Sequence, residues 1–260
     1  MLRLAYSILL ACAATLVGAA PPSLPTGPAA DLVRQGLAAE ASQDVRRALD
    51  LFLAAEKAGT PEAFLLQKIA RQYSDLVMDL PTREEQRAFA QHALDYSKRA
   101  VALEPRNAVN VLSVAISYGK LALASDTRDK VRYSRLVREE AERALALDAN
   151  YAWAHHVLGR WHAEVAELGG VSRTAVRLFY GGLPSATLAD AMRHLERAVA
   201  LEPDELQHHL ELGFVYLKKG ETDRARASLE RGLALPSRAR IDEPAKARAR
   251  TAVAGLRPSP

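Results

Sequence analysis

The heptapeptide RAVALEP occurs twice in this chain of 260 residues, at Arg99–Pro105 and at Arg197–Pro203. Two related segments, RALALDA and RGLALPS, occupy Arg143–Ala149 and Arg231–Ser237. Proline has no backbone N–H to donate, and it disfavours the helical conformation in the residue before it. Each segment is therefore predicted to be the last turn of a helix, and the proline of RAVALEP is its stop signal. The recurrence indicates that one structural unit is repeated along the chain.

A pattern of small and large residues precedes these segments. A small residue stands three positions before a ring at four places: Ala70/Tyr73, Ala115/Tyr118, Gly159/His162 and Gly213/Tyr216. Gly213 is followed twelve residues later by Ala225, then by Leu229 and Gly232, and Gly36 is followed at the same spacing by Ala48, then by Phe52 and Ala55. Two helices approach closely only where side chains are small. The pattern resembles the tetratricopeptide repeat, a helix pair of about 34 residues.

These repeats predict an all-α fold, a right-handed tetratricopeptide-like α-solenoid of about five helix pairs with a C-terminal capping helix. The pairs must stack, because no single pair buries its own apolar face. The fourth unit is the longest and carries an insert, VSRTAVRLFYGG, at residues 171–182. The composition also favours helices, since aromatic residues make up only 6% of the chain.

Three helix starts are predicted from capping residues. Thr82 and Glu85 have the spacing of a capping box, and LPSAT at Leu183–Thr187 is expected to start a helix in the same way. Asp242, two residues before Pro244, is expected to cap a terminal helix that runs to about Leu256.

The N-terminus has the pattern of a secretion signal. Arg3 precedes an apolar run from Leu4 to Val17, and the residues that follow permit cleavage after Ala19. We therefore predict a signal peptide at residues 1–19, a Pro-rich linker at 20–29 and a tetratricopeptide-repeat domain at 30–258, in a protein that is exported to a periplasm or secreted. The alternative is attachment to a membrane through an uncleaved N-terminus or a lipidated Cys12, the only cysteine. Loss of Cys12 with the signal would exclude disulfides from the mature chain.

The fourth unit also resembles a known family. HHVLGRWHAEVAEL at His155–Leu168 and GGLPSATLADAMRHLERAVAL at Gly181–Leu201 are similar to segments of the regulator of microtubule dynamics family, and the resemblance extends over residues 30–256. It implies a tetratricopeptide protein without catalytic activity. Eukaryotic members associate with microtubules, and some attach to organelle membranes, where the repeat domain is thought to bind phospholipid. Because an exported compartment holds no microtubules, the family name does not predict the partner of this chain.

A candidate ligand-binding groove follows from the register of the repeats. If each small residue is position eight, positions two, five, nine and twelve of each first helix line the concave face of such an array. The third unit places Val109, Leu112, Ile116 and Gly119 there, and the ligand-binding residues predicted in the fourth and fifth units are Trp153, His156, Arg160, Leu210 and Phe214. Arg160 would meet an anionic head group or a carboxylate, whereas Trp153 and Phe214 would supply apolar contact.

Two alternatives remain for this groove. Leu178, Phe179 and Tyr180 of the insert either plug it or leave it open, and Arg160 either meets a ligand or pairs with an acidic residue inside the insert. Most of the groove positions are apolar. A clamp of Lys, Arg and Asn side chains around a C-terminal carboxylate is therefore not expected.

The sequence favours a non-catalytic interaction scaffold that binds a protein or peptide partner on its concave face. The alternative is a lipid-binding or lipid-transfer module that takes phospholipid into the apolar groove. No nucleophile elbow, phosphate loop or carboxylate pair indicates an enzyme, no cofactor is expected, and the histidines lack the spacing of a zinc site. Nucleic acid is not an expected partner, because residues 231–260, with seven basic and two acidic side chains, supply the positive net charge of +4. A membrane would be contacted only through the N-terminus.

Overall fold

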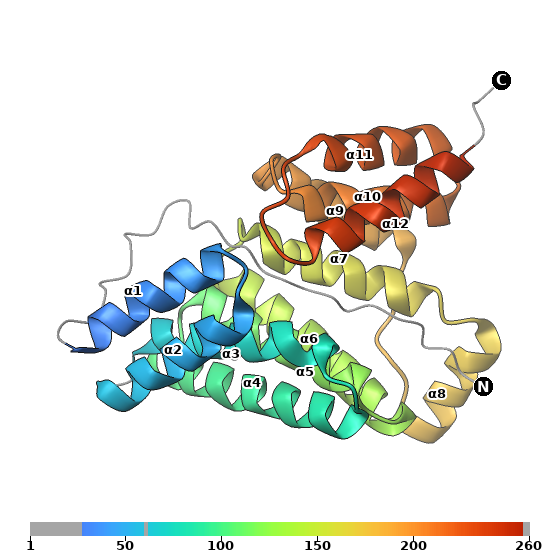
Figure 1. Cartoon of the computed structure of the whole chain (residues 1–260). Helices are drawn as coiled ribbons and strands as arrows, with labels where there is room; N and C mark the ends of the chain where they lie inside the picture. Colours follow the sequence, from blue (N-terminus) through green and yellow to red (C-terminus); the bar gives the residue numbers. More distant parts are fainter. Residues whose placement is uncertain (1–27, 60–61, 257–260) are drawn as a thin grey trace. The chain divides into compact units, whose positions relative to one another are not determined.

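The computed structural model describes residues 28–59 and 62–256, and all regular secondary structure in these residues is helical (Figure 1). The chain forms two compact units that divide between Leu147 and Asp148. The first unit contains α1 Pro28–Ala41, α2 Val45–Ala58, α3 Ala63–Leu76, a 3₁₀ turn Val77–Asp79, α4 Arg83–Leu103, α5 Ala108–Leu123 and α6 Thr127–Leu147. The second contains α7 Ala152–Ala166, α8 Gly170–Tyr180, α9 Leu188–Leu201, α10 Leu206–Lys219, α11 Thr222–Ala234 and α12 Asp242–Gly255.

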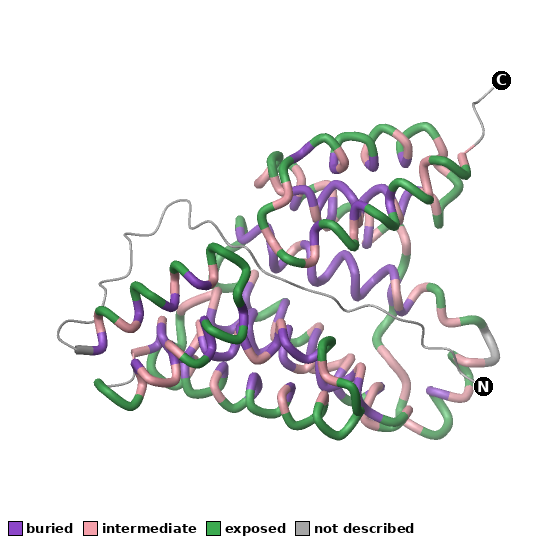
Figure 2. The backbone as a smooth tube through the Cα atoms, in the orientation of Figure 1, coloured by how far each residue is buried: buried purple, intermediate pink, exposed green. Residues whose placement is uncertain are grey.

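The helices of each unit pack in pairs. The pairs are α1/α2, α3/α4 and α5/α6 in the first unit and α7/α9 and α10/α11 in the second, with α12 packed against α10 and α11. In the four pairs that follow α1/α2, the first helix is the more buried: α5 and α7 are buried around most of their circumference, whereas α4 and α6 bury one face (Figure 2). The prediction of an all-α solenoid with five helix pairs and a C-terminal capping helix is confirmed.

The two RAVALEP segments end their helices in the same way. Helix α4 ends at Leu103 and α9 ends at Leu201, in each case two residues before the proline. The intervening residues, Glu104 and Glu202, have φ and ψ of −131° and 76° and of −130° and 76°. Both leave the helical region because the proline ring clashes with a helical residue before it. Identical sequence therefore produces identical helix ends, as predicted.

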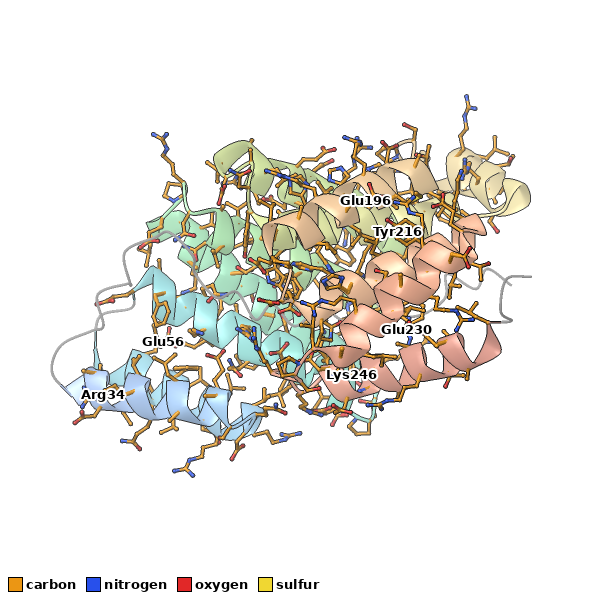
Figure 3. All side chains as sticks on the ribbon, turned by 90° about the horizontal axis from the view of Figure 1, so that it is seen from above. Arg34, Glu56, Glu196, Tyr216, Glu230 and Lys246 are labelled. Atoms are coloured by element: carbon orange, nitrogen blue, oxygen red, sulfur yellow. The ribbon has the colours of Figure 1, made fainter. Side chains whose placement is uncertain are left out.

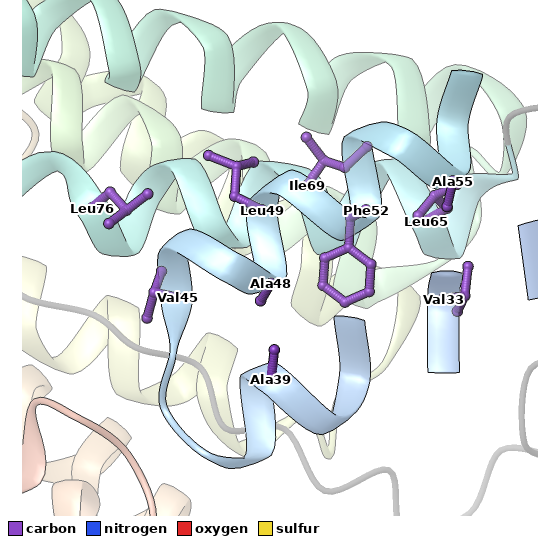
Figure 4. Packing of buried hydrophobic residues seen from close by; sticks show 10 residues of the cluster. All are labelled: Val33, Ala39, Val45, Ala48, Leu49, Phe52, Ala55, Leu65, Ile69 and Leu76. Atoms are coloured by element: carbon purple, nitrogen blue, oxygen red, sulfur yellow. The ribbon is translucent and has the colours of Figure 1, made fainter. Parts of the chain in front are cut away.

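The small residues of the first helices mark the points where two helices cross. A methyl group on Gly36 would lie 2.5 Å from the Phe52 ring, and one on Gly213 would lie 2.6 Å from Leu229. Gly159 of α7 has the same relation to Leu195 of α9, at 2.6 Å. Figure 4 shows Phe52 within the apolar cluster that α1, α2 and α3 share. The sequence pattern of small and large residues thus corresponds to one contact, repeated in three pairs.

The rings that follow the small residues contact the second helices. Tyr73 lies against Phe89 and Tyr96 of α4, with ring centroids 5.3 and 5.8 Å away. Tyr118 of α5 stacks on Tyr133 of α6 at 5.8 Å. The hydroxyl of Tyr216 donates to Glu196 Oε1 of α9 at 2.8 Å, which links the last two pairs (Figure 3). These contacts fill the space beside each crossing point.

Two of the three predicted helix starts have the expected caps. Thr82 Oγ1 accepts from the Glu85 backbone N–H, and Glu85 returns the contact to the Thr82 N–H, so α4 begins with a full capping box. Thr187 Oγ1 accepts from the Asp190 N–H at the start of α9.

The prediction that Asp242 caps the terminal helix is wrong. Asp242 is the first residue of α12, and the residue before it, Ile241, makes no side-chain cap. The buried Asp242 carboxylate instead accepts from the backbone N–H groups of Arg238 and Ala239, and from Gln207 Nε2 of α10 at 2.6 Å. Asp242 therefore links α12 and the loop before it to α10 through these hydrogen bonds.

The insert forms α8, whose apolar end is open to solvent. Leu178 and Phe179 are 73% and 75% exposed, the highest values among the large apolar side chains of the described residues. The alternative in which these two residues plug a groove is therefore wrong. Gly181 and Gly182 end the helix with positive φ of 76° and 79°, a conformation that favours glycine.

The predicted signal peptide, its cleavage after Ala19 and the lipidation of Cys12 all fall on residues 1–27, outside the described residues. None of the helices in the described residues combines the length and the apolar character that a membrane crossing requires.

Candidate functional site

Three of the predicted ligand-binding residues share one face of α7. Trp153, His156 and Arg160 are 1%, 2% and 7% exposed, at spacings of three and four residues that place them in one row. The Trp153 ring meets the His208 ring of α10 edge to face at 4.7 Å, and His156 Nδ1 lies 3.0 Å from His208 Nδ1. Burial, together with the neighbouring His208 and Arg160, holds the pKa of His156 well below its usual value. The part of this face that carries Trp153 and His156 is thus packed against His208 of α10 and buried.

Arg160 is engaged by two carboxylates of its own unit. Its guanidinium lies 3.2 Å from Glu164 Oε1, one turn along α7, and 3.7 Å from Glu211 Oε1 of α10. Helix α8, which the insert forms, holds no acidic residue. The alternative in which Arg160 pairs with an acidic residue of the insert is therefore wrong. Burial raises the pKa of the Glu164 carboxyl to about 7, and Arg160 only partly opposes this. An anionic ligand at Arg160 would have to compete with both carboxylates.

Leu210 and Phe214 pack toward the other side of α10. Leu210 is 1% exposed and fills the space beside Gly232 of α11, where an added methyl group would lie 2.5 Å from it. Phe214 is half-buried, and the Arg248 guanidinium of α12 covers its ring at 4.6 Å. The structure therefore brings Trp153, His156 and Arg160 together, but places Leu210 and Phe214 in the core that α10 shares with α11 and α12. Binding of a ligand by the five residues stays a prediction.

A cleft in the first unit is a second candidate site. It lies between α3 and α5 and has a cavity volume of about 20 Å³. Its lining residues are Gln67, Ala70, Arg71, Ser74, Asp75, Ser113 and Ile116. The lining therefore combines an arginine, a carboxylate, hydroxyls and an amide with two apolar side chains.

A network of charged side chains borders this cleft. Glu40 of α1 accepts from Lys68 Nζ at 2.6 Å and from Gln72 Nε2 at 2.8 Å, and lies 3.5 Å from Arg71 Nε. Arg71 Nε lies 3.6 Å from Asp75 Oδ2. The side chains of Glu40, Lys68, Arg71 and Asp75 are only 15–18% exposed, so each charge has lost most of its hydration.

Burial and pairing act on the pKa values of this network in different directions. Burial raises the pKa of Asp75, and the attraction of Arg71 and Lys120 only partly offsets it. Burial would also raise the pKa of Glu40, but Arg71 and Lys68 together outweigh it and hold this pKa below its usual value. Lys120 of α5 is 1% exposed, which makes it the most buried cation among the described residues.

The sequence pattern that predicts this cleft is the position count used above for the third to fifth repeats, in which the small residue is position eight. With Ala70 as position eight of its helix, positions five, nine and twelve are Gln67, Arg71 and Ser74, and all three line the cleft. With Gly36 as position eight, position twelve is Glu40. Extending the count to the first two repeats would have found these residues. The register does not reveal Asp75 and Lys120.

Comparison with known proteins supports the fold and the family. The chain is 25% identical to regulator of microtubule dynamics protein 1 of Mus musculus over 194 residues, which is 74% of this chain and 64% of that protein. It is 28% identical to regulator of microtubule dynamics protein 3 of Xenopus laevis over 138 residues, 53% of this chain and 30% of that protein. The chain thus matches less than two thirds of the length of these relatives.

A solved structure and a family model also match this chain. A tetratricopeptide protein of Thermus thermophilus superposes with a TM-score of 0.66 at 22% identity, covering 87% of this chain and 99% of that one. The likeness shows the fold: this is a tetratricopeptide array. The family described as regulator of microtubule dynamics protein 1-3 matches residues 32–257. The chain belongs to the regulator of microtubule dynamics family.

Proposed function

We propose that this protein is a non-catalytic interaction scaffold that binds a protein or peptide partner on the concave face of its tetratricopeptide array. One observation carries the proposal. Groove positions of α3 bring the polar side chains Gln67, Arg71 and Ser74 to one cleft, and Glu40 at a groove position of α1 lies 3.5 Å from Arg71 Nε. A fold held together by apolar helix crossings gains little from such costly buried charges, whereas a recognition surface needs them.

A selection of peptides tests the proposal. Random 12-residue peptides are panned against the purified full chain, and the retained peptides are measured with Arg71→Gln, Arg160→Gln and Arg143→Gln. Arg143 of α6 pairs with Glu140 of its own helix at 3.0 Å and belongs to neither candidate site, which makes it the matched control. We expect binding that Arg71→Gln or Arg160→Gln weakens and Arg143→Gln leaves unchanged. If all three variants bind alike, the partner does not use the concave face.

The lipid alternative depends on apolar groove positions. Leu112 and Leu210 are fully buried between helices, and Phe214 is covered by Arg248, so these side chains offer little surface to an acyl chain. Native mass spectrometry of the protein purified from cells compares the two functions. Bound phospholipid at stoichiometric amounts would replace the peptide proposal with lipid binding.

We also propose export, with cleavage after Ala19. The support is the charged start, the apolar run and the small residues of the N-terminus. Mass spectrometry of the mature N-terminus should find Ala20 as the first residue. A lipidated Cys12 at the N-terminus would instead show a protein anchored to a membrane.

A further inference from the structure

We propose that His155 of α7 and His194 of α9 form a binding site for a divalent transition metal that favours imidazole ligands, and that Cu(II) is the ion that fits it best. The two side chains approach each other through their Nδ1 atoms, which lie 3.0 Å apart. Both side chains are half-buried, so solvent reaches the pair. With Gly159 as position eight of its helix, His155 is position four, so the site lies outside the groove positions of the proposed scaffold.

The ring of His155 is held in the form that a metal ligand needs. Its Nε2 lies 3.2 Å from the backbone oxygen of Ala149. A carbonyl oxygen only accepts, so Nε2 carries the proton and Nδ1 keeps its lone pair on the side of His194. Histidines that bind a metal through one ring nitrogen typically donate from the other to a carbonyl or carboxylate in this way. His194 needs only to exchange its Nδ1–H tautomer for the equally neutral Nε2–H tautomer.

The separation of the two nitrogens indicates which ion fits. Imidazole nitrogens bind such metals at about 2.0–2.1 Å, so two of them on one ion stand about 2.9 Å apart at a right angle and about 3.3 Å apart in a tetrahedron. The observed 3.0 Å is nearer to the right angle, which is the geometry of square-planar or tetragonal Cu(II) and Ni(II). Of these two ions, Cu(II) binds more tightly. Rotation of each ring about χ2, a broad torsion, turns both lone pairs toward the ion.

The pair supplies two protein ligands, and water would complete the coordination. Among residues 28–59 and 62–256, no three His, Cys, Asp or Glu side chains are grouped so that they could hold one ion. The closed four-ligand site of structural zinc is therefore not expected, in agreement with the sequence. Because the remaining positions face solvent, the bound ion would be exchangeable.

The charges around the pair do not exclude a cation. Arg193 and Arg197 act on His155 and would repel a metal ion, but each is opposed by a carboxylate. Asp190 pairs with Arg193 at 2.7 Å, and Asp148 acts on His155 in the direction opposite to Arg197.

A second histidine pair on the same helix provides a contrast. His156 Nδ1 also lies 3.0 Å from His208 Nδ1 of α10, but these two side chains are 2% and 0% exposed. Trp153 packs against the His208 ring. A metal ion at this pair would lose its waters and bury its charge, which is costly. Binding is therefore expected at the half-buried pair and not at the buried one.

Titration of the full chain with Cu(II), followed by calorimetry, tests the site. We expect one Cu(II) per chain, bound at least about tenfold more weakly by His155→Gln and by His194→Gln. Two control variants should bind as wild type. They are His208→Gln, in the buried pair, and His92→Gln, which removes an exposed histidine of α4.

Electron paramagnetic resonance of the wild-type protein with one equivalent of Cu(II) gives a readout that does not depend on the stability of any variant. The spectrum should be tetragonal, with couplings to two imidazole nitrogens. A spectrum without two such nitrogens, or a chain that binds no Cu(II), would overturn the site. If His92→Gln weakens binding as much as His194→Gln, the ion binds adventitiously to surface histidines and the site is also overturned. None of these results bears on the peptide-binding function, which the peptide selection tests separately.

Discussion

At the scale of single residues, Gly213 shows how little room the helix crossings leave. An added methyl group would lie 2.6 Å from Leu229 Cγ and 3.2 Å from its backbone nitrogen. The side chain could rotate away, but the backbone of α11 could not without moving the helix.

We therefore expect Gly213→Ala to destabilise the protein by about 1–3 kcal/mol, the usual cost of overpacking a core. Gly255 is the matched control, because it is also helical and a methyl group there would meet no atom within 4 Å. Thermal or urea unfolding of both variants measures the difference. Equal stabilities for Gly213→Ala and Gly255→Ala would contradict the packing at this crossing.

Arg160, predicted from the sequence to meet an anionic ligand, is paired with carboxylates of the protein itself. Because Glu164 and Glu211 flank its guanidinium, Arg160→Gln leaves two carboxylates without their shared cation. We expect a loss of about 1–3 kcal/mol at pH 8, above the pKa of Glu164. The loss should shrink below pH 7, since the pKa of Glu164 is about 7 and its carboxyl is then protonated. A pH-independent loss of stability would show that charge is not the cause.

At the scale of elements, histidine pairs join α7 to its neighbours. His155 Nδ1 lies 3.0 Å from His194 Nδ1 of α9, and His162 stacks on the same His194 ring at 5.6 Å. Burial, with His155 and Arg193 close by, lowers the pKa of His194 from its usual 6.5 to about 4. Between these two values the unfolded chain binds a proton that the folded protein does not. His194 therefore costs stability as the pH falls from about 6.5 to about 4.

Replacing His194 with glutamine should remove this cost. The free energy of unfolding of His194→Gln, relative to wild type, should rise between pH 7 and pH 5 by up to about 2 kcal/mol. The comparison with wild type is needed because Glu164 and Glu205, whose pKa values burial raises to about 7, act in the opposite direction. A difference between variant and wild type that stays constant over this range would contradict a half-buried, neutral His194.

At the scale of the whole molecule, the protein is an array of helix pairs divided into two compact units. In such arrays each repeat contacts only its neighbours, so the effect of a local change is expected to remain local. Hydrogen exchange of Gly213→Ala measures this directly. Exchange should increase in α9 to α12 and stay unchanged in α1 to α6. An equal increase throughout would show that the two units unfold as one.

What the sequence determined by itself is the set of features that depend on neighbours in the chain. The helix ends at Glu104 and Glu202 follow from the proline one residue later, and the capping box at Thr82 follows from a residue three positions on. The crossing of Gly213 and Leu229 follows from the repeat spacing, because a regular helix pair converts sequence distance into position.

The tertiary structure alone decided how side chains from separate pairs meet. Asp242 has the sequence signal of a helix cap but binds Gln207 of α10, since the packing of α12 brings the two within reach. Glu40 and Lys68 are 28 residues apart in the chain, and only the stacking of α1 and α2 beside α3 brings them to 2.6 Å. Periodicity predicts which face of a helix is buried, but the partners of a buried charge depend on crossing geometry, which local sequence does not encode.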